Sequence, residues 1–352
     1  MLRYGLIGSG MMGQEHIRNI ALVEDAKITA IAEPDPRMRA RASQIAPDAA
    51  LFTTHKEMLS ADLCDAYVIV TPNDTHHQIL LDILPAGKPI LCEKPLCTTI
   101  THCNDVIKAA KAPVWVAMEY RYMDPLQELK KALPRIGAGQ MISIREHRFP
   151  FLDKVGDWNR FSARTGGTLT EKCCHFWDLM RLMLGSNPTR VYASANMDVN
   201  HQNERYDGQK PDIIDNAYVI VDFENGARGM LDLCMFAEGA EWQETVTVTG
   251  DKGRLEARIP GSHLAEDKTT LRAELSFADR ATHKETTRQI ISDPKILAAG
   301  SHHGSTYYQH QKFAALIREG GTPEVSLEDG LWSVRVGEAA EQSAKTGLPI
   351  AL

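Results

Sequence analysis

The stretch GLIGSGMMG, residues 5–13, decides the fold. It closes a short apolar run and spaces three glycines, Gly8, Gly10 and Gly13, ahead of an amphipathic segment. In a Gly-x-Gly-x-x-Gly loop, the first glycine allows a tight turn, the second lets the backbone approach a pyrophosphate, and the third lets the helix pack closely on the sheet. The helix start also offers free N–H groups and a positive dipole end. We therefore predict a dinucleotide-binding strand–loop–helix unit.

The chain up to residue 122 repeats this alternation of short apolar runs and amphipathic segments. Strands that alternate with helices form a parallel sheet covered on both faces, and buried parallel strands have continuous apolar sequences. We predict a nucleotide-binding domain over residues 1–122, of the α/β class. Its expected strands are residues 4–8, 27–32, 49–52, 66–71, 89–93 and 114–119.

Glu33 indicates which cofactor this domain prefers. It follows the second predicted strand, 20 residues after Gly13. There an acidic side chain can accept hydrogen bonds from both ribose hydroxyls of NAD. A 2′-phosphate would be repelled, so we expect NAD rather than NADP, although Arg37 nearby keeps NADP open. The competing interpretation is a set of turn glycines beside a surface glutamate.

The stretch VTPNDTHH, residues 70–77, follows the fourth predicted strand. Ligands of an open parallel sheet bind beyond the carboxyl ends of its strands, so this loop should lie near the cofactor. Alternatively, Asn73 or Thr75 caps the next helix. The residues that we expect to bind the cofactor are Gly8, Gly10, Met11, Met12, Gly13, Glu33, Thr71, Pro72, Asn73, His76, Glu93 and Lys94.

The second half, residues 123–352, has a different pattern. Strand-like segments follow one another across short turns at 224–227 and 250–253, which predicts a mostly antiparallel sheet. Expected strands are 140–149, 189–196, 216–223, 227–236, 244–250 and 253–259, expected helices are 124–133, 166–185, 304–318 and 327–345, and expected loops are 151–167, 199–212 and 259–270.

The expected helix GGTLTEKCCHFWDLMRLMLG, residues 166–185, is apolar yet carries four ionisable residues. At about 100° per residue, Glu171, His175 and Asp178 share one face within about 60°, and Lys172 points about 100° away from Glu171. Buried charges are costly unless they are paired or used. We interpret the polar face as a pocket wall, with a buried ion-pair network as the alternative.

The tripeptide Glu93-Lys94-Pro95, between a strand and a helix, resembles the signature of the Gfo/Idh/MocA oxidoreductase family, which includes glucose–fructose oxidoreductase and inositol dehydrogenase. The glycine loop, TPNDTH, the 166–185 segment and the C-terminal tail resemble that family as well, so the resemblance covers nearly the whole chain. It implies a Rossmann domain followed by an α/β domain with a large open sheet, often used for oligomerisation. Two departures are Glu171, where the family usually has Asp, and Cys173, where it usually has a small residue.

The resemblance and the helix face together suggest a mechanism. We expect His175 to act as a general base, because imidazole titrates near neutral pH. Glu171 or Asp178 would orient it, and Lys94, held extended by Pro95, would donate to the reacting oxygen. Whether Lys94 or His175 finally holds the proton stays open. The expected catalytic residues are Lys94, His175 and Glu171.

Substrate contacts are expected from the segments near residues 120, 158 and 302. Asn159, His302, His303 and Tyr307 are additional candidates, whereas we expect Arg164 to be solvated. Aromatic and hydrogen-bonding groups suit a sugar ring, and several cations weakly indicate an anionic sugar. The expected substrate-binding residues are Lys94, Tyr120, Arg121, Tyr122, Trp158, Arg160, Lys172, His175 and Asp178.

These features favour an NAD-dependent dehydrogenase that acts on a hydroxyl of a sugar, sugar acid or cyclitol. One alternative is an NAD-dependent oxidoreductive glycosidase, which oxidises a glycoside transiently and eliminates the aglycone; Lys172 and Asp178 keep it open. Another alternative is a non-catalytic NAD-binding sensor, although a sensor does not need Lys94, Glu171 and His175.

Composition limits the remaining classes. The net charge is −7 without a basic block, so we expect no nucleic-acid partner, and no apolar run is long enough for a membrane span. Seven irregularly spaced cysteines predict a cytoplasmic protein without a disulfide framework. Cys173, Cys174 and His175 would point apart on a helix, so we expect no metal site. A homo-oligomer, dimer or tetramer, is expected from the family resemblance.

Overall fold

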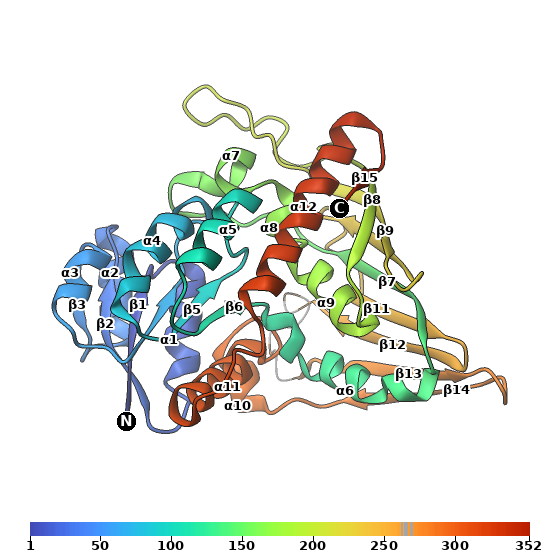
Figure 1. The fold of residues 1–352 in the computed structure, drawn as a ribbon, viewed down its shortest axis with the longest axis horizontal. Helices are drawn as coiled ribbons and strands as arrows, with labels where there is room; N and C mark the ends of the chain where they lie inside the picture. Colours follow the sequence, from blue (N-terminus) through green and yellow to red (C-terminus); the bar gives the residue numbers. More distant parts are fainter. Residues whose placement is uncertain (262, 264–266, 268–269) are drawn as a thin grey trace.

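The first six strands form a parallel sheet in the order β3-β2-β1-β4-β5-β6 (Figure 1). All six overlap the predicted strands, and the helices between them cover both faces of the sheet. β1 lies between β2 and β4, so the strand order reverses there, and a ligand site is expected beyond the carboxyl ends of these strands. The elements are β1 (Leu2–Ile7), α1 (Met11–Ile20), β2 (Ala26–Ala32), α2 (Pro36–Ile45), β3 (Ala50–Phe52), α3 (His55–Ser60), β4 (Ala66–Ile69), α4 (His76–Ile83), β5 (Ile90–Glu93), α5 (Ile100–Ala109) and β6 (Val114–Ala117).

The second sheet has nine strands in the order β14-β13-β12-β11-β7-β10-β9-β8-β15. Only the β7–β10 pair is parallel, so the predicted α/β fold with a large, mostly antiparallel sheet is confirmed. Its strands are β7 (Gly139–His147), β8 (Pro188–Asn196), β9 (Asn216–Phe223), β10 (Arg228–Cys234), β11 (Trp242–Gly250), β12 (Gly253–Pro260), β13 (Ala273–Asp279), β14 (Lys284–Ile290) and β15 (Ile350–Ala351).

This computed structural model describes residues 1–261, 263, 267 and 270–352. Part of the predicted loop 259–270 therefore lies outside the described residues. The β13–β14 hairpin was not predicted, because β14 reads KETTRQI and buries only Ile290, so it lacks the apolar alternation by which strands are recognised. Within the described residues, no helix is both long enough and apolar enough to cross a membrane.

The helices α6 (Asp124–Ala132), α9 (Cys174–Leu184) and α12 (Leu327–Thr346) pack between the two sheets or on the second sheet (Figure 1). α12 contacts β8 and α9 on one side and α5 and β6 on the other, so it joins the two halves. α10 (Pro294–Ala299) and α11 (Ser305–Glu319) pack against α1. Phe313 of α11 belongs to the core of the first sheet, so a segment of the second half completes the first. The domain boundary at residue 122 stays a prediction.

The predicted single helix over 166–185 is wrong in one respect, because it divides into α8 (Thr168–Glu171) and α9. The N–H of Lys172 donates to the Thr168 carbonyl at 2.9 Å, and the N–H of Cys173 donates to that same carbonyl at 3.3 Å. This second bond spans five residues instead of four, so the turn is widened. A regular rotation of about 100° per residue therefore does not apply across Lys172 and Cys173.

Candidate active site

The glycine loop has three different local constraints. Gly8 has a φ of +90°, which L residues with side chains rarely adopt. A Cβ on Gly13 would lie 2.5 Å from the Gly8 carbonyl oxygen, whereas a Cβ on Gly10 would meet nothing within 4 Å. Gly8 and Gly13 therefore serve the turn and its packing, and the space in front of Gly10 is open. An open backbone beside the start of α1 fits a bound pyrophosphate.

Glu33 lies at the end of β2 and faces this loop. Its carboxylate accepts hydrogen bonds from the Ser9 N–H at 2.6 Å and from the Asp35 N–H at 2.8 Å. Arg37 is exposed and lies 3.6 Å from Asp35. The acidic group thus lies beside the loop. Arg37 is turned to Asp35, and Arg39 donates to the backbone carbonyl of Glu33 rather than to its carboxylate. This arrangement fits a ribose with two free hydroxyls.

The loop after β4 is tied to the loop after β5. His76 is fully buried, with one ring nitrogen 2.9 Å from the Pro95 carbonyl oxygen and the other 3.0 Å from that of Thr71. Burial lowers its pKa. A neutral imidazole has one N–H and can donate to only one of these two carbonyls. Because both ring nitrogens face the backbone of the protein, the expectation that His76 contacts the cofactor is not supported, and the buried ring packs between the two loops. Asn73 donates to the Thr165 carbonyl at 3.3 Å.

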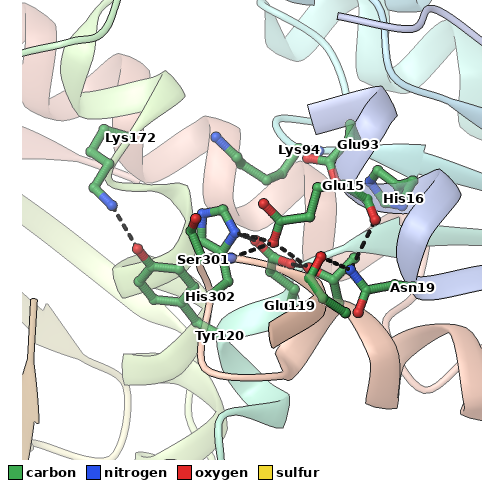
Figure 2. Close-up of polar contacts among 12 residues, drawn as sticks. Glu15, His16, Asn19, Glu93, Lys94, Glu119, Tyr120, Lys172, Ser301 and His302 are labelled. Atoms are coloured by element: carbon green, nitrogen blue, oxygen red, sulfur yellow. Dashed lines mark hydrogen bonds and ion pairs between the residues drawn. The ribbon is translucent and has the colours of Figure 1, made fainter. Parts of the chain in front are cut away.

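Lys94 follows β5, and its peptide bond to Pro95 is cis. Its ammonium group donates to the Glu171 carbonyl at 3.4 Å, so the chain brings together two residues 77 positions apart. Burial lowers the pKa of Lys94, but the Glu171 carboxylate and other acidic groups outweigh that effect, and the pKa is raised. Glu93 points the other way, to His16 at 2.9 Å (Figure 2). Lys94 is therefore a cation beside Glu171 at neutral pH.

His175, the second residue of α9, lies in the same region. Its Nδ1 is buried and has no hydrogen-bond partner among the described residues. Burial lowers its pKa well below the ordinary value, and the positive charges of Lys94 and Lys172 act in the same direction. The imidazole is therefore neutral at pH 7, with a nitrogen free to accept a proton. Glu171 likewise has one carboxylate oxygen, Oε2, buried without a partner among these residues.

Lys172 belongs to a buried polar cluster on the sheet side of His175. Its amine is 2.9 Å from the Glu146 carboxylate of β7 and donates to the Tyr120 hydroxyl at 2.7 Å (Figure 2). Burial lowers the pKa of Lys172 and raises that of Glu244 to about 7. Lys172 is thus held by partners of the protein itself.

Asp178 is not part of this group. It is fully buried, and its two carboxylate oxygens accept hydrogen bonds from Arg121 at 2.6 and 2.5 Å. Arg121 also donates to the Glu324 carbonyl at 3.0 Å. The expected roles of Asp178 in orienting His175 and of both residues in binding substrate are therefore not supported: the pairing with Arg121 leaves Asp178 in the ion-pair network that was the alternative.

The remaining substrate candidates are dispersed. Tyr122 packs against Trp115 with ring centres 6.2 Å apart, and Arg160 is 2.8 Å from Asp153 and 3.2 Å from Glu204. Tyr122 thus packs in the core and Arg160 holds a loop, so the expected contacts of these two residues with the substrate are not supported. Trp158 is buried at 9% exposure. The other candidates lie as follows: Asn159 donates to the Leu152 carbonyl, Arg164 pairs with Asp74, His303 contacts the Pro260 carbonyl, and Tyr307 packs on Tyr308.

His302 lies close to the Lys94 region, in the loop before α11. Its Nδ1 is 2.9 Å from Glu15 of α1 and 3.7 Å from Glu119, as Figure 2 shows. Burial lowers the pKa of His302, but these carboxylates raise it to about 9. His302 is thus a cation that ties the second half of the chain to α1.

The sequence did not single out Glu15, Glu119, Glu146 or Lys154 as members of this region. Lys154 is in the predicted loop 151–167, and burial lowers its pKa while Glu171 counteracts this. Each of these residues sits in a separate segment with no motif spacing. A charged residue within an otherwise alternating buried strand, as Glu146 is in β7, was the one available signal.

A parallel sheet with an open glycine loop, next to a lysine, a carboxylate and a neutral imidazole, defines a nucleotide-dependent oxidoreductase. Two family models match: "Oxidoreductase family, NAD-binding Rossmann fold" over residues 2–119 and "Oxidoreductase family, C-terminal alpha/beta domain" over residues 130–352. The chain belongs to the Gfo/Idh/MocA oxidoreductase family, and it is an NAD-binding oxidoreductase.

Named relatives are similar along the whole chain. The inositol 2-dehydrogenase of Rhizobium meliloti is 27% identical over 349 residues, covering 97% of this chain and 96% of the relative. The scyllo-inositol 2-dehydrogenase (NAD(+)) of Bacillus subtilis is 25% identical, covering 100% and 96%. A levoglucosan dehydrogenase solved with NADH has a TM-score of 0.82 at 22% identity, covering 99% of this chain and 98% of that one. This last likeness shows the fold.

Proposed function

We propose that this protein is an NAD-dependent dehydrogenase that oxidises a hydroxyl group of a sugar, sugar acid or cyclitol. The observation that carries the proposal is that Lys94, Glu171 and His175 lie close together. The half-buried Lys94 ammonium donates to the Glu171 carbonyl and its charge acts on His175, while Glu171 and His175 each have one buried atom without a partner among the described residues. The relatives named inositol 2-dehydrogenase and the solved levoglucosan dehydrogenase support a polyhydroxylated substrate.

Lys94, His175 and Glu171 each have a separate role in the oxidation of an alcohol. The Lys94 ammonium donates to the substrate oxygen and stabilises the negative charge that develops there. The His175 imidazole accepts the hydroxyl proton, because its lowered pKa keeps it neutral and able to act as a base. The Glu171 carboxylate keeps Lys94 in its charged form, which is the form that donates to the substrate oxygen.

The cofactor fits the loop after β1. Gly8, Gly10 and the start of α1 would hold the pyrophosphate, and Glu33 would accept the ribose hydroxyls. NAD, when bound, supplies the acceptor for the hydride. Because a 2′-phosphate would lie against the Glu33 carboxylate, we propose that NAD is preferred over NADP. Titrating both cofactors by fluorescence tests this; a tighter constant for NADP would contradict it.

The main experiment is a survey of inositols, neutral sugars and sugar acids with NAD, following the absorbance of reduced cofactor. Net accumulation of reduced cofactor is expected. The oxidoreductive glycosidase alternative predicts release of the aglycone from aryl glycosides with only catalytic NAD and without net reduction. A protein that binds NAD but turns over no compound in either assay would favour the sensor alternative. Asp178 no longer supports the glycosidase, since Arg121 holds it.

We also propose a homo-oligomer, a dimer or tetramer, formed through the second sheet. Neighbouring strands β7 to β10 expose Met141, Tyr192, Tyr218, Ile220 and Met230, at 40 to 65% exposure. A contiguous apolar face of this kind is typical of subunit contacts. Light scattering should give a multiple of 39.1 kDa, and Tyr218→Lys should lower it; a monomer in both would contradict the proposal. The cytoplasmic location stays a prediction.

A further inference from the structure

The orientation of His175 requires a cause, because no carboxylate supplies one. Among the described residues its Nδ1 has no partner, and Asp178 is bound to Arg121. A general base works only if its ring is held at the correct angle to the substrate. Another neighbour must therefore fix the imidazole.

Tyr120 is that neighbour. Its ring lies parallel to the His175 ring, with centres 4.0 Å apart and planes at 7°. Tyr120 is in a short helical turn, η3 (Glu119–Tyr122), and is buried. A face-to-face stack at this distance blocks one face of the imidazole and fixes its plane.

Lys172 in turn holds Tyr120. Its ammonium donates to the phenol oxygen at 2.7 Å and pairs with Glu146 at 2.9 Å; Figure 2 shows the amine directed at the hydroxyl. Lys172 is at the widened turn between α8 and α9, three residues before His175. Its position thus depends on the same irregular turn that places the base.

We propose that Tyr120 and Lys172 are positioning residues for His175: the phenol ring fixes the imidazole plane, and the lysine, anchored on Glu146, fixes the phenol. The role of His175 as base rests on the proposed function, but the positioning itself does not. The sequence analysis assigned both residues to the substrate. Here they act through His175, and the lysine at position 172 is a fixed part of the protein scaffold.

The charges around His175 agree with this arrangement. Burial lowers its pKa most, and cations of four different segments add to that effect. The groups that face it are Lys94 after β5, Lys172 before α9, Arg148 after β7 and His302 before α11, with Tyr120 stacked on the ring and Glu171 one turn away. Removing one of these cations weakens the repulsion of a protonated imidazole, so its pKa should rise.

The test combines NMR with kinetics. In protein labelled at histidine, the His175 signals, assigned through His175→Gln, should show a neutral ring at pH 7 and a titration midpoint below the usual histidine value. Lys172→Met should raise the midpoint by about one pH unit or more, and Lys172→Arg should keep it near the native value. Lys88→Met serves as the control and should leave the midpoint unchanged, because this lysine is paired with Asp62 and precedes β5, at the opposite end of that strand from Lys94.

Kinetics then test the positioning. Tyr120→Leu removes the stack and should lower kcat about ten-fold with little change in KM, whereas Tyr120→Phe keeps the stack and should lose less. A His175 midpoint that does not move in Lys172→Met, with native folding by circular dichroism, would overturn the lysine's role. Equal kcat in Tyr120→Leu and wild type would overturn the stack. Because NMR needs no substrate, failure of the proposed dehydrogenase activity would be recognised separately.

Discussion

Glu171 and His175 lie in the first half of the segment 166–185, and Asp178 lies about one turn beyond His175. The first two have buried atoms without partners, whereas both oxygens of Asp178 are bound by Arg121. All three are nearly inaccessible, so burial alone does not distinguish them. The difference is whether the protein satisfies its own polar groups. In this segment the paired Asp178 holds the fold, whereas Glu171 and His175, which have unpaired atoms, lie where we propose that the substrate binds.

The largest effect is expected from Lys94→Ala, which removes the cation beside Glu171 and His175. Turnover should fall about 10³-fold, because a donor to the developing oxyanion is lost, and NAD affinity should change little. Stopped-flow or steady-state rates and cofactor fluorescence titration measure the two quantities. Lys88→Ala, which removes a lysine paired with Asp62 far from the glycine loop, is the control. Parallel losses of turnover and NAD affinity in Lys94→Ala would contradict the assignment.

Substitution of Asp178, whose carboxylate is fully paired, should lower the stability of the protein. Asp178→Ala leaves the Arg121 guanidinium buried without its partner and should lower the free energy of unfolding by about 3–5 kcal/mol. Glu171→Gln, at the residue with an unpaired carboxylate oxygen, should change it by less than about 1 kcal/mol while lowering activity. Urea denaturation of the two variants gives the comparison directly. If Asp178→Ala kept its stability and lost activity, the carboxylate would belong to the site after all.

Gly13 and Gly10 allow a similar comparison, because one serves the packing of the protein and the other leaves space for a ligand. A Cβ at position 13 would clash with the Gly8 carbonyl oxygen, so Gly13→Ala should destabilise the fold by about 1–3 kcal/mol. A Cβ at position 10 meets no protein atom, so Gly10→Ala should fold normally. It should nevertheless weaken NAD binding about ten-fold, the equivalent of about 1.4 kcal/mol. Thermal unfolding with and without NAD separates these effects; a destabilised Gly10→Ala without loss of affinity would contradict the assigned open space.

The sequence predicted the parts of the site that depend on local chemistry. The glycine loop, Glu33 and Lys94 lie at the ends of apolar strands, and their spacing marks them. It could not predict which carboxylate is paired, because Arg121 and Asp178 are 57 positions apart and periodicity contains no information on such contacts. The periodicity also predicted one regular helix over 166–185, because the widened turn at Lys172 and Cys173 depends on packing that the sequence does not reveal. The stacking of Tyr120 on His175 is likewise not predicted by any motif in the sequence.

The smallest effect is expected at His302, whose Nδ1 faces acidic side chains. Its Nδ1 pairs with Glu15, and the pKa of His302 is raised to about 9. A pKa raised on folding stabilises the protein below the usual histidine value and loses that contribution as pH rises through about 9. The melting temperature should therefore fall by about 2–4 °C between pH 7 and 9.5, beyond the change shown by Glu15→Gln, in which the imidazolium has lost this carboxylate. Calorimetry at both pH values measures the difference. Identical slopes for the native protein and Glu15→Gln would mean that the pair does not link α1 to the loop before α11, and His302 would then belong with the unsatisfied groups of the site.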